Sequence, residues 1–269
     1  MTNLVLVVGA TGGVGQLTVA GLLDKGINVR ALTRHPDQAQ KLFDHRVEVV
    51  VGDIRFPSTL AAIMPGITHI ICCAGTTAFP STRWEFDQNL TILDWLSFAL
   101  NPRASCDRAQ NSPQQVDAEG IQHLVSVTPS DLQRFVLISS CGIERKQRLP
   151  YSLLNTFGVL DAKAQGEAAL LASGRPYTII RPGRLIDGPY TAYDLNTLLK
   201  AKTKLKLGLL LGTGDTLTGQ TSRIDLAAAC VESLFSPMTV GKVFELVNQG
   251  PRPSVLHWET LFAKLGQNH

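Results

Sequence analysis

Three glycines at fixed spacing lie near the start of the chain, in the run GATGGVG. They directly follow the apolar run 4–8 and precede the amphipathic segment 13–25. Glycine allows a tight turn and a close approach of the backbone to a pyrophosphate, and the next helix offers free N–H groups and a positive dipole end. A glycine-rich turn without a ligand is the alternative, but the strand before the run and the helix after it favour a phosphate loop. We therefore expect a dinucleotide phosphate loop formed by Gly9, Thr11, Gly12, Gly13, Val14 and Gly15.

The residues after the second apolar run, 28–33, indicate which dinucleotide is bound. Sites specific for NAD usually place an Asp or Glu there to bind the ribose 2′-hydroxyl, but this chain has no acid until Asp37. Arg34 instead offers a planar cation to a 2′-phosphate. The sequence thus favours NADP(H) over NAD(H), and the alternative for Arg34 is a side chain that faces solvent.

Two later segments are also expected to contact the cofactor. Asp53 and Ile54 follow the third apolar run, 47–52, and are placed to contact adenine; the alternative for Asp53 is a helix cap. The fourth run, 69–74, is the next place where the backbone must pass close to the cofactor. Small residues suit that approach, and they are Ala74, Gly75 and Thr76.

Short runs rich in Val, Ile and Leu alternate with amphipathic segments along most of the chain. Besides the four runs above, strands are expected at 134–139, 177–181 and 242–247. Helices are expected over 13–25, near 37–43, 57–64, 115–127 and 159–172, and from Asp225, which is expected to cap the last of them. This alternation predicts a parallel sheet with helices on both faces.

The alternation stops after Gly75. Residues 84–100 have a helical pattern, and the polar run that follows them carries two prolines. We expect part of residues 84–112 to be an insertion that serves as a lid or as a surface for a protein partner. The alternative is a passive surface helix packed through Trp84 or Trp95.

The bulk composition is that of a soluble globular protein. Of the 269 residues, 44% are apolar and 17% are charged, and a formal charge of +3 is too small to suggest nucleic acid binding. No apolar stretch approaches ~18 residues and no targeting segment is visible, so we expect no membrane span and a cytoplasmic location. Five cysteines without CxxC spacing and six scattered histidines predict reduced thiols and no metal site.

Several segments together resemble the short-chain dehydrogenase/reductase superfamily, in its extended and atypical branches. Besides the glycine run, these are VLISS (136–140), Lys163, TIIRPGRLIDGP (178–189) and SRIDLA (222–227). The chain most resembles the NAD(P)H-binding, NmrA-like proteins of cyanobacteria and chloroplasts. The resemblance implies an α/β fold, a Rossmann-type doubly wound parallel sheet with helices on both faces and a small C-terminal substrate lobe. That group includes both reductases and proteins that bind the cofactor without known turnover.

This resemblance sets the expected domain organisation. We expect residues 1–269 to form a single NAD(P)-binding Rossmann domain, with a core of about 1–181 and 222–250. The substrate lobe is expected over about 182–221, together with the C-terminal tail. Four lysines of the lobe lie in KAKTKLK, residues 200–206, and suggest either a solvated face or a contact with an acidic partner or membrane surface.

The expected reaction centre departs from the superfamily pattern, which places a Tyr four residues before the active-site Lys. Here Lys163 is preceded at that distance by Val159, which can transfer no proton. The resemblance implies that Lys163 holds the nicotinamide ribose, but it does not supply a tyrosine acid for carbonyl reduction. Tyr151, Tyr190 and Tyr193 are other candidates, with packing or surface roles as the alternative.

Residues at the ends of the fifth and sixth strands complete the expected site. Ser139 and Ser140 stand at the end of the fifth strand. We expect Ser139 to contact the cofactor and Ser140 to contact cofactor or substrate. Cys141 takes that place if the alignment shifts by one residue. Pro182 and Gly183 are expected to bring backbone close to the nicotinamide amide.

Two functions remain open on this sequence. The first, which we favour, is an NADPH-dependent oxidoreductase with a non-standard active site that acts on a small molecule such as a quinone-like or conjugated acceptor. The second is a cofactor-binding redox sensor or assembly factor that performs little chemistry. Lys163 and the lobe support the first function, whereas Val159 and the insertion support the second.

Overall fold

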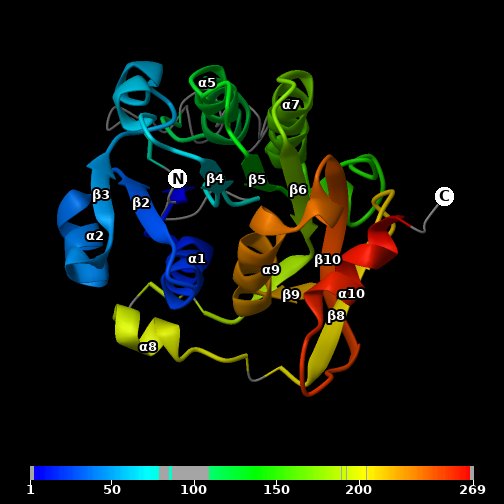
Figure 1. Ribbon diagram of the computed structural model, residues 1–269. Coiled ribbons are helices and arrows are strands. Elements are labelled where there is room, and N and C mark those ends of the chain that lie inside the picture. The colour runs from blue at the N-terminus through cyan, green and yellow to red at the C-terminus, as the bar shows by residue number, and fades with distance from the viewer. Residues whose placement is uncertain are drawn as a thin grey trace.

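The apolar runs form the strands of one sheet (Figure 1). The computed structural model describes residues 3–78, 85–86, 109–188, 190–191, 193–203 and 205–266. Within these residues the sheet has ten strands in the order β3-β2-β1-β4-β5-β6-β10-β9-β7, and β8 pairs with β10. The strands are β1 (Leu4–Val8), β2 (Asn28–Thr33), β3 (Glu48–Val51), β4 (His69–Cys72), β5 (Arg134–Ile138), β6 (Tyr177–Pro182), β7 (Arg184–Ile186), β8 (Leu207–Gly212), β9 (Gln220–Ser222) and β10 (Lys242–Pro251).

Strands β1 to β6 and β10 pair in parallel, and this confirms the predicted Rossmann-type fold. The chain proceeds outward from β1 to β3, then returns to β4 on the other side of β1. Such a reversal leaves a crevice at the carboxyl ends of the strands, where ligands of this fold class bind. Strands β8 and β9 pair antiparallel with β10 and extend the sheet beyond its parallel part.

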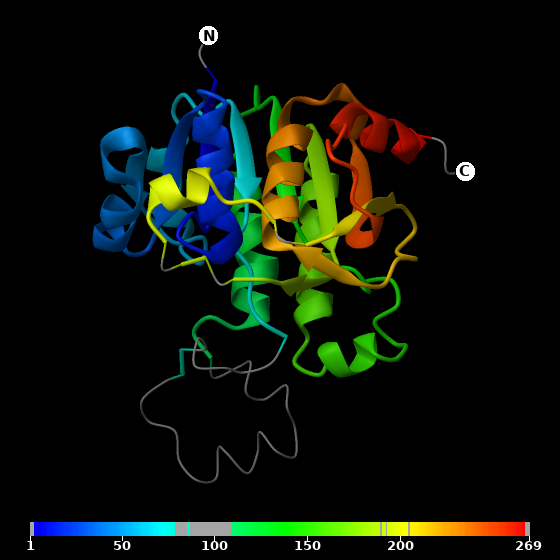
Figure 2. The ribbon, with the colours of Figure 1, turned by 90° about the horizontal axis from the view of Figure 1, so that it is seen from below.

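Helices cover both faces of the sheet, with α5 and α7 on one face and α1 and α9 on the other (Figure 1). Each face has its own buried apolar core, which includes Leu17 and Leu226 on one side and Leu124 and Leu170 on the other. Figure 2 shows α8 lying against α1. The helices are α1 (Gly13–Asp24), α2 (Pro36–Phe43), α5 (Gly120–Ser126), α6 (Tyr151–Leu154), α7 (Val159–Ala172), α8 (Leu195–Leu199), α9 (Arg223–Phe235) and α10 (Trp258–Ala263). Among the residues that the structure describes, no helix is long and apolar enough to cross a membrane.

Two of the expected helices differ from the prediction. The segment 57–64 forms two short 3₁₀ turns, Pro57–Thr59 and Ala61–Ile63. A regular helix does not form because a proline lies at each end of the segment and the Thr59 hydroxyl donates to nearby backbone carbonyls. The helix expected near 115–127 begins with a π-helical turn, Gln114–Glu119, before α5. Helix α7 has the predicted bounds.

The predicted cap of the last long helix is wrong. Helix α9 begins at Arg223, and the Ser222 side chain caps it by accepting from the N–H of Ile224. Asp225 lies in the first turn, where it is buried and accepts hydrogen bonds from Asn248 and Arg252. A serine three positions earlier caps the helix, so the Asp225 carboxylate is free to bind the C-terminal strand instead.

A buried cation beside the sheet affects a neighbouring histidine. Arg134 is buried and donates to Thr178, Thr239 and the carbonyls of Ser233 and Ser236; within the described part of the chain none of its partners is a carboxylate. His69 is also buried at this end of the sheet. Burial, together with the charge of Arg134, lowers the pKa of His69 to about 4.

This lowered pKa predicts a loss of stability in mild acid. Unfolded chains protonate His69 near its ordinary pKa of about 6.5, whereas the folded protein keeps it neutral until about pH 4. The contribution of His69 to the free energy of unfolding is therefore complete above about pH 6.5. It declines as the pH falls, by about 2 kcal/mol between pH 7 and pH 5. Urea unfolding of the wild type and of His69→Gln at both pH values measures this difference. An NMR titration that shows His69 protonating near pH 6.5 in the folded protein would contradict it.

Candidate functional site

The glycine run forms the turn between β1 and α1. Gly9 has a φ of +74°, and a Cβ at this position would lie 2.9 Å from the backbone nitrogen of Ala74. The N–H of Gly12 donates to the carbonyl of Gly9 at 3.0 Å. A Cβ on Gly15 would collide with that same carbonyl, so glycine is needed for α1 to pack against β1.

The start of α1 has the features of an anion cradle. Its N-cap is Gly12, which has no side chain to cap the helix, and its first turn has no acidic residue. The first N–H groups of a helix have no partner within the helix, so Gly13 and Val14 offer N–H donors at the positive end of the helix dipole. These groups fit a pyrophosphate, as the sequence predicts.

A cavity of about 320 Å³, here called the strand-end cavity, extends from this loop along the carboxyl ends of the first four strands. Its volume lies in the range of small-molecule sites. It is lined by most of the predicted cofactor residues, namely Gly9, Thr11, Gly12, Arg34, Asp53, Ile54, Ala74, Gly75 and Thr76. Further lining residues that sequence reasoning missed include His35, Arg55, Thr77, Asn111 and Val116.

Other predicted cofactor residues lie outside this cavity. Gly13, Val14 and Gly15 belong to α1 beside it, and Val14 is buried in the core. Gly183 packs against Gly219 of the segment before β9, and its N–H donates to the carbonyl of Leu246 and to the Thr221 hydroxyl. Position 183 therefore needs glycine because a Cβ there would collide with the backbone of Gly219.

Two arginines face one end of the strand-end cavity. Arg34 makes an ion pair of 3.0 Å with Glu85. Arg55 pairs with Asp53 at 2.6 Å and lies 3.4 Å from Glu85. Burial by itself would raise the pKa of Asp53, but hydrogen bonds and charge from Arg55 hold it below its ordinary value. The Asp53 carboxylate therefore orients Arg55, and it caps no helix because the next helical turn begins at Pro57.

A second polar group joins Lys163 to the loop after β4. The Lys163 ammonium donates to Asp117 at 2.6 Å, and the N–H and hydroxyl of Thr76 donate to the other oxygen of the same carboxylate. The Asp117 side chain is 2% exposed and that of Lys163 is 14% exposed. Sequence reasoning missed Asp117, because nothing in its spacing relates it to a lysine 46 residues later.

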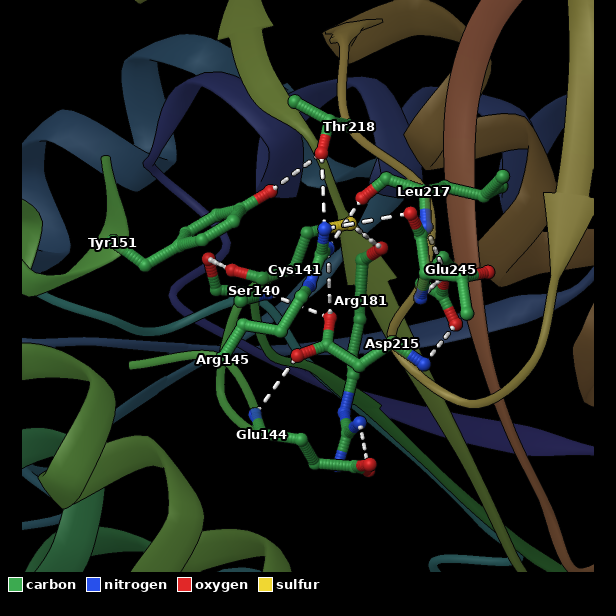
Figure 3. Close-up of polar contacts among 12 residues, drawn as sticks. Ser140, Cys141, Glu144, Arg145, Tyr151, Arg181, Asp215, Leu217, Thr218 and Glu245 are labelled. Atoms are coloured by element: carbon green, nitrogen blue, oxygen red, sulfur yellow. Dashed lines mark hydrogen bonds and ion pairs between the residues drawn. The ribbon is translucent and has the colours of Figure 1, made fainter. Parts of the chain in front are cut away.

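The two serines after β5 differ in their surroundings. Ser139 is buried, its Oγ has no hydrogen-bond partner among the described residues, and it lines a cavity of about 10 Å³ with Asp117 and Lys163. Ser140 instead donates to the carbonyl of Cys141 (Figure 3). The structure thus brings Ser139, and not the favoured Ser140, beside Lys163. Successive side chains of an extended segment point to opposite sides, so only one of the two can face the lysine.

Cys141 does not have the surroundings of a reactive thiol. It is buried, and its Sγ donates to the carbonyl of Arg181 at 3.1 Å (Figure 3). Burial, with the nearby carboxylates of Glu245 and Asp215, raises the pKa of Cys141 to about 12. A thiolate nucleophile at this position is therefore disfavoured.

Tyr151 folds back towards the position of the missing tyrosine. Its ring packs in a small apolar cluster with Val159, Ile143 and Leu160. Its hydroxyl lies 3.1 Å from that of Thr218, and the guanidinium of Arg145 lies 4.6 Å from its ring centroid (Figure 3). Tyr151 and Lys163 therefore belong to separate hydrogen-bond networks within the described residues.

Buried carboxylates hold the loop after β5 against the segment between β8 and β9 (Figure 3). Asp215 accepts hydrogen bonds from the N–H groups of Gly142 and Glu144 at 2.7 and 2.8 Å. Glu245 on β10 in turn accepts from the N–H of Asp215 at 2.8 Å. These contacts fix the backbone that follows Ser139.

A second cavity, here called the lobe groove, has a volume of about 1010 Å³ and lies among residues 186–205 and Ile224. The rings of Tyr190 and Tyr193 line it with centroids 6.0 Å apart, and Lys200 and Lys202 of the basic run also line it. Burial, together with Asp187, raises the pKa of Tyr190 to about 12. The groove lies beside the phosphate loop, since a Cβ on Gly13 would lie 3.7 Å from the backbone nitrogen of Tyr190.

The described residues cover only part of the predicted insertion. Of residues 84–112, they include 85–86 and 109–112. Most of the predicted helical pattern lies outside them, and so do Trp84, Trp95, Cys106 and Lys204. No group of His, Cys, Asp or Glu in the described part of the chain is arranged to hold a metal ion.

Comparisons with known proteins agree with this geometry. Residues 9–237 match the NAD(P)H-binding family model. Sanguinarine reductase of Eschscholzia californica is 30% identical over 278 residues, which cover 97% of this chain and 95% of that protein. Protein TIC 62 of Pisum sativum is 29% identical over 272 residues, and the photosystem II assembly factor Ycf39 of Trieres chinensis is 27% identical over 245 residues.

The last two relatives are longer than the region that matches. The matches cover 93% and 91% of this chain but only 44% of TIC 62 and 63% of Ycf39. TIC 62 is named as a chloroplast protein, so the cytoplasmic location of this chain stays a prediction. Among solved structures, the oxidoreductase ylbE of Lactococcus lactis shares the fold, with a TM-score of 0.69 at 18% identity over 99% of this chain and 98% of that one.

Proposed function

The chain belongs to the NAD(P)H-binding, NmrA-like group of atypical short-chain dehydrogenases/reductases, and on this basis we propose that it is an NADPH-dependent oxidoreductase that works without the usual tyrosine. The observation that carries the proposal is the network of Lys163, Asp117 and Thr76 beside the strand-end cavity. This network supports the proposal because it holds the Lys163 ammonium, the cation that the resemblance assigns to the nicotinamide ribose. The substrate lobe, about 182–221, contributes the lobe groove as space for a small molecule.

Each part of the site has a role in binding. The N–H groups of Gly13 and Val14 bind the pyrophosphate, and Arg34 binds the 2′-phosphate that distinguishes NADPH from NADH. Lys163 binds the nicotinamide ribose, held in place by Asp117. Ser139 offers a hydroxyl that has no other partner in the described residues.

The chemistry follows from what Lys163 and Val159 can do. When bound, NADPH supplies a hydride. Val159 holds no proton, so the Lys163 ammonium stabilises the negative charge that develops on the acceptor, and water supplies the proton afterwards. This order of steps, hydride transfer before protonation, suits a quinone or an enone, because hydride addition to either gives a stabilised anion. The resemblance to sanguinarine reductase supports a reductase.

Single-turnover oxidation of NADPH tests the proposal. Purified protein is mixed with NADPH and with each member of a panel of quinones, enones and aldehydes, and the loss of nicotinamide absorbance is followed. We expect oxidation with the quinones or enones and little with the aldehydes, which need an acid at the carbonyl oxygen. NADPH that binds tightly but is never consumed would overturn the proposal.

A second function, a cofactor-binding sensor or assembly factor, is favoured by one observation. The place of the missing acid is filled by the apolar cluster around Val159 and Tyr151, which contributes no proton donor to Lys163. The resemblance to Ycf39, named as a photosystem II assembly factor, supports this alternative. In that case residues 84–112 are the candidate surface for a protein partner, and binding without consumption is the expected result of the same experiment.

A further inference from the structure

Glu85 bridges the two arginines of the strand-end cavity. Its two carboxylate oxygens lie 3.0 Å from Nη1 of Arg34 and 3.4 Å from Nη1 of Arg55. Arg55 also has Asp53 as a closer partner, at 2.6 Å. For Arg34, Glu85 is the one carboxylate partner among the residues that the structure describes.

The backbone around Glu85 is held by residues on the far side of the insertion. Its N–H donates to the side chain of Asn111 and its carbonyl accepts from the N–H of Gln110, both at 2.8 Å. Phe86 and Ala109 form an isolated β-bridge. Arg55 binds the carbonyl of Gln110 at 2.7 Å, so the two ends of the insertion and the arginines form one connected unit.

The Glu85 carboxylate binds the guanidinium of Arg34, the group assigned above to the 2′-phosphate. Both groups are anions, and a guanidinium binds either of them through charge-assisted hydrogen bonds from its N–H groups. The side chains of Arg34 and Glu85 are 41% and 44% exposed, so their ion pair is weak and another anion can replace it. Two anions on one exposed guanidinium repel each other, and a phosphate of about two negative charges has the stronger attraction.

We propose that Glu85 is a built-in competitor of the 2′-phosphate. A ligand that carries this phosphate displaces the Glu85 carboxylate from Arg34 and loosens the unit formed by residues 85–86 and 109–111. A ligand without it leaves the ion pair in place. The inference rests on the proposed role of Arg34 in binding NADPH, and it makes residues 85–86 and 109–111 respond to one phosphate group of the cofactor.

The matched ligands 2′,5′-ADP and 5′-AMP test this directly, because they differ only in the 2′-phosphate. Calorimetry measures both dissociation constants for the wild type and for Glu85→Gln. Removal of the competing charge is expected to tighten 2′,5′-ADP binding about fivefold and to change 5′-AMP binding less than about twofold. Glu232→Gln, which removes a carboxylate paired with Lys25 in another part of the protein, is the control and should change neither.

Hydrogen exchange provides a second readout that does not depend on the variant. The N–H of Gln110 is protected by the carbonyl of Glu85, so 2′,5′-ADP should speed its exchange and 5′-AMP should not. Unchanged 2′,5′-ADP affinity in Glu85→Gln would overturn the inference while leaving the NADPH preference standing. Equal affinity of the wild-type protein for the two ligands would overturn the preference itself, and the inference with it.

Discussion

Replacing Lys163 with alanine is expected to slow NADPH oxidation by the best quinone or enone acceptor about 100-fold or more, the range for a lost catalytic group. The ammonium is the one cation that the structure, in its described part, holds against Asp117 and Thr76. Without the Lys163 ammonium, only backbone groups and water stabilise the negative charge that develops on the acceptor. Stopped-flow measurement of the single turnover separates this loss from slower product release.

The control for Lys163→Ala is Lys146→Ala, because Lys146 makes a similar ion pair with Asp161, at 2.7 Å, without taking part in the proposed chemistry. Asp117→Asn provides an independent test. It keeps the size of the side chain but removes the charge that orients Lys163, so the rate should fall. Turnover by Lys163→Ala within about threefold of the wild type would refute the assignment, since a lost catalytic group costs far more.

Replacing Arg34 with alanine is expected to weaken NADPH binding about 10- to 100-fold and NADH binding by less than about threefold, as befits a lost charge-assisted hydrogen bond. The reason is that the 2′-phosphate is the only group that distinguishes the two cofactors. Arg34 lines the strand-end cavity after β2, where an NAD-specific site usually has an acid. Calorimetric titration of each cofactor gives the two constants.

Two further variants make the Arg34 result specific. Arg34→Lys keeps the charge but not the planar pair of donors, and should recover part of the NADPH affinity. Arg46→Ala removes another exposed arginine, one that bonds to Asn196 away from the cavity, and should alter neither constant. If Arg34→Ala weakened NADPH and NADH equally, Arg34 would serve the site as a whole and the preference for NADP(H) would have no support.

The sequence by itself determined the fold class and the glycine turn between β1 and α1. Both depend on local order: an apolar run long enough for a strand, glycines where the turn needs them, and a helical pattern afterwards. The glycine at position 9 adopts a positive φ, and the one at position 15 lets α1 approach β1, as the spacing predicts. The parallel sheet follows from the same alternation, because parallel strands need crossover helices between them.

Only the tertiary structure decided which polar groups meet. Asp117 reaches Lys163 because the π-helical turn at 114–119 and α7 pack side by side on one face of the sheet. Glu85 reaches Arg34 across 51 residues of chain, and the direction of the backbone after β5 selects Ser139 over Ser140. Such contacts depend on the angles and distances between whole elements. No spacing in the sequence encodes these quantities, so a sequence can supply the residues of a site while the fold decides which of them act together.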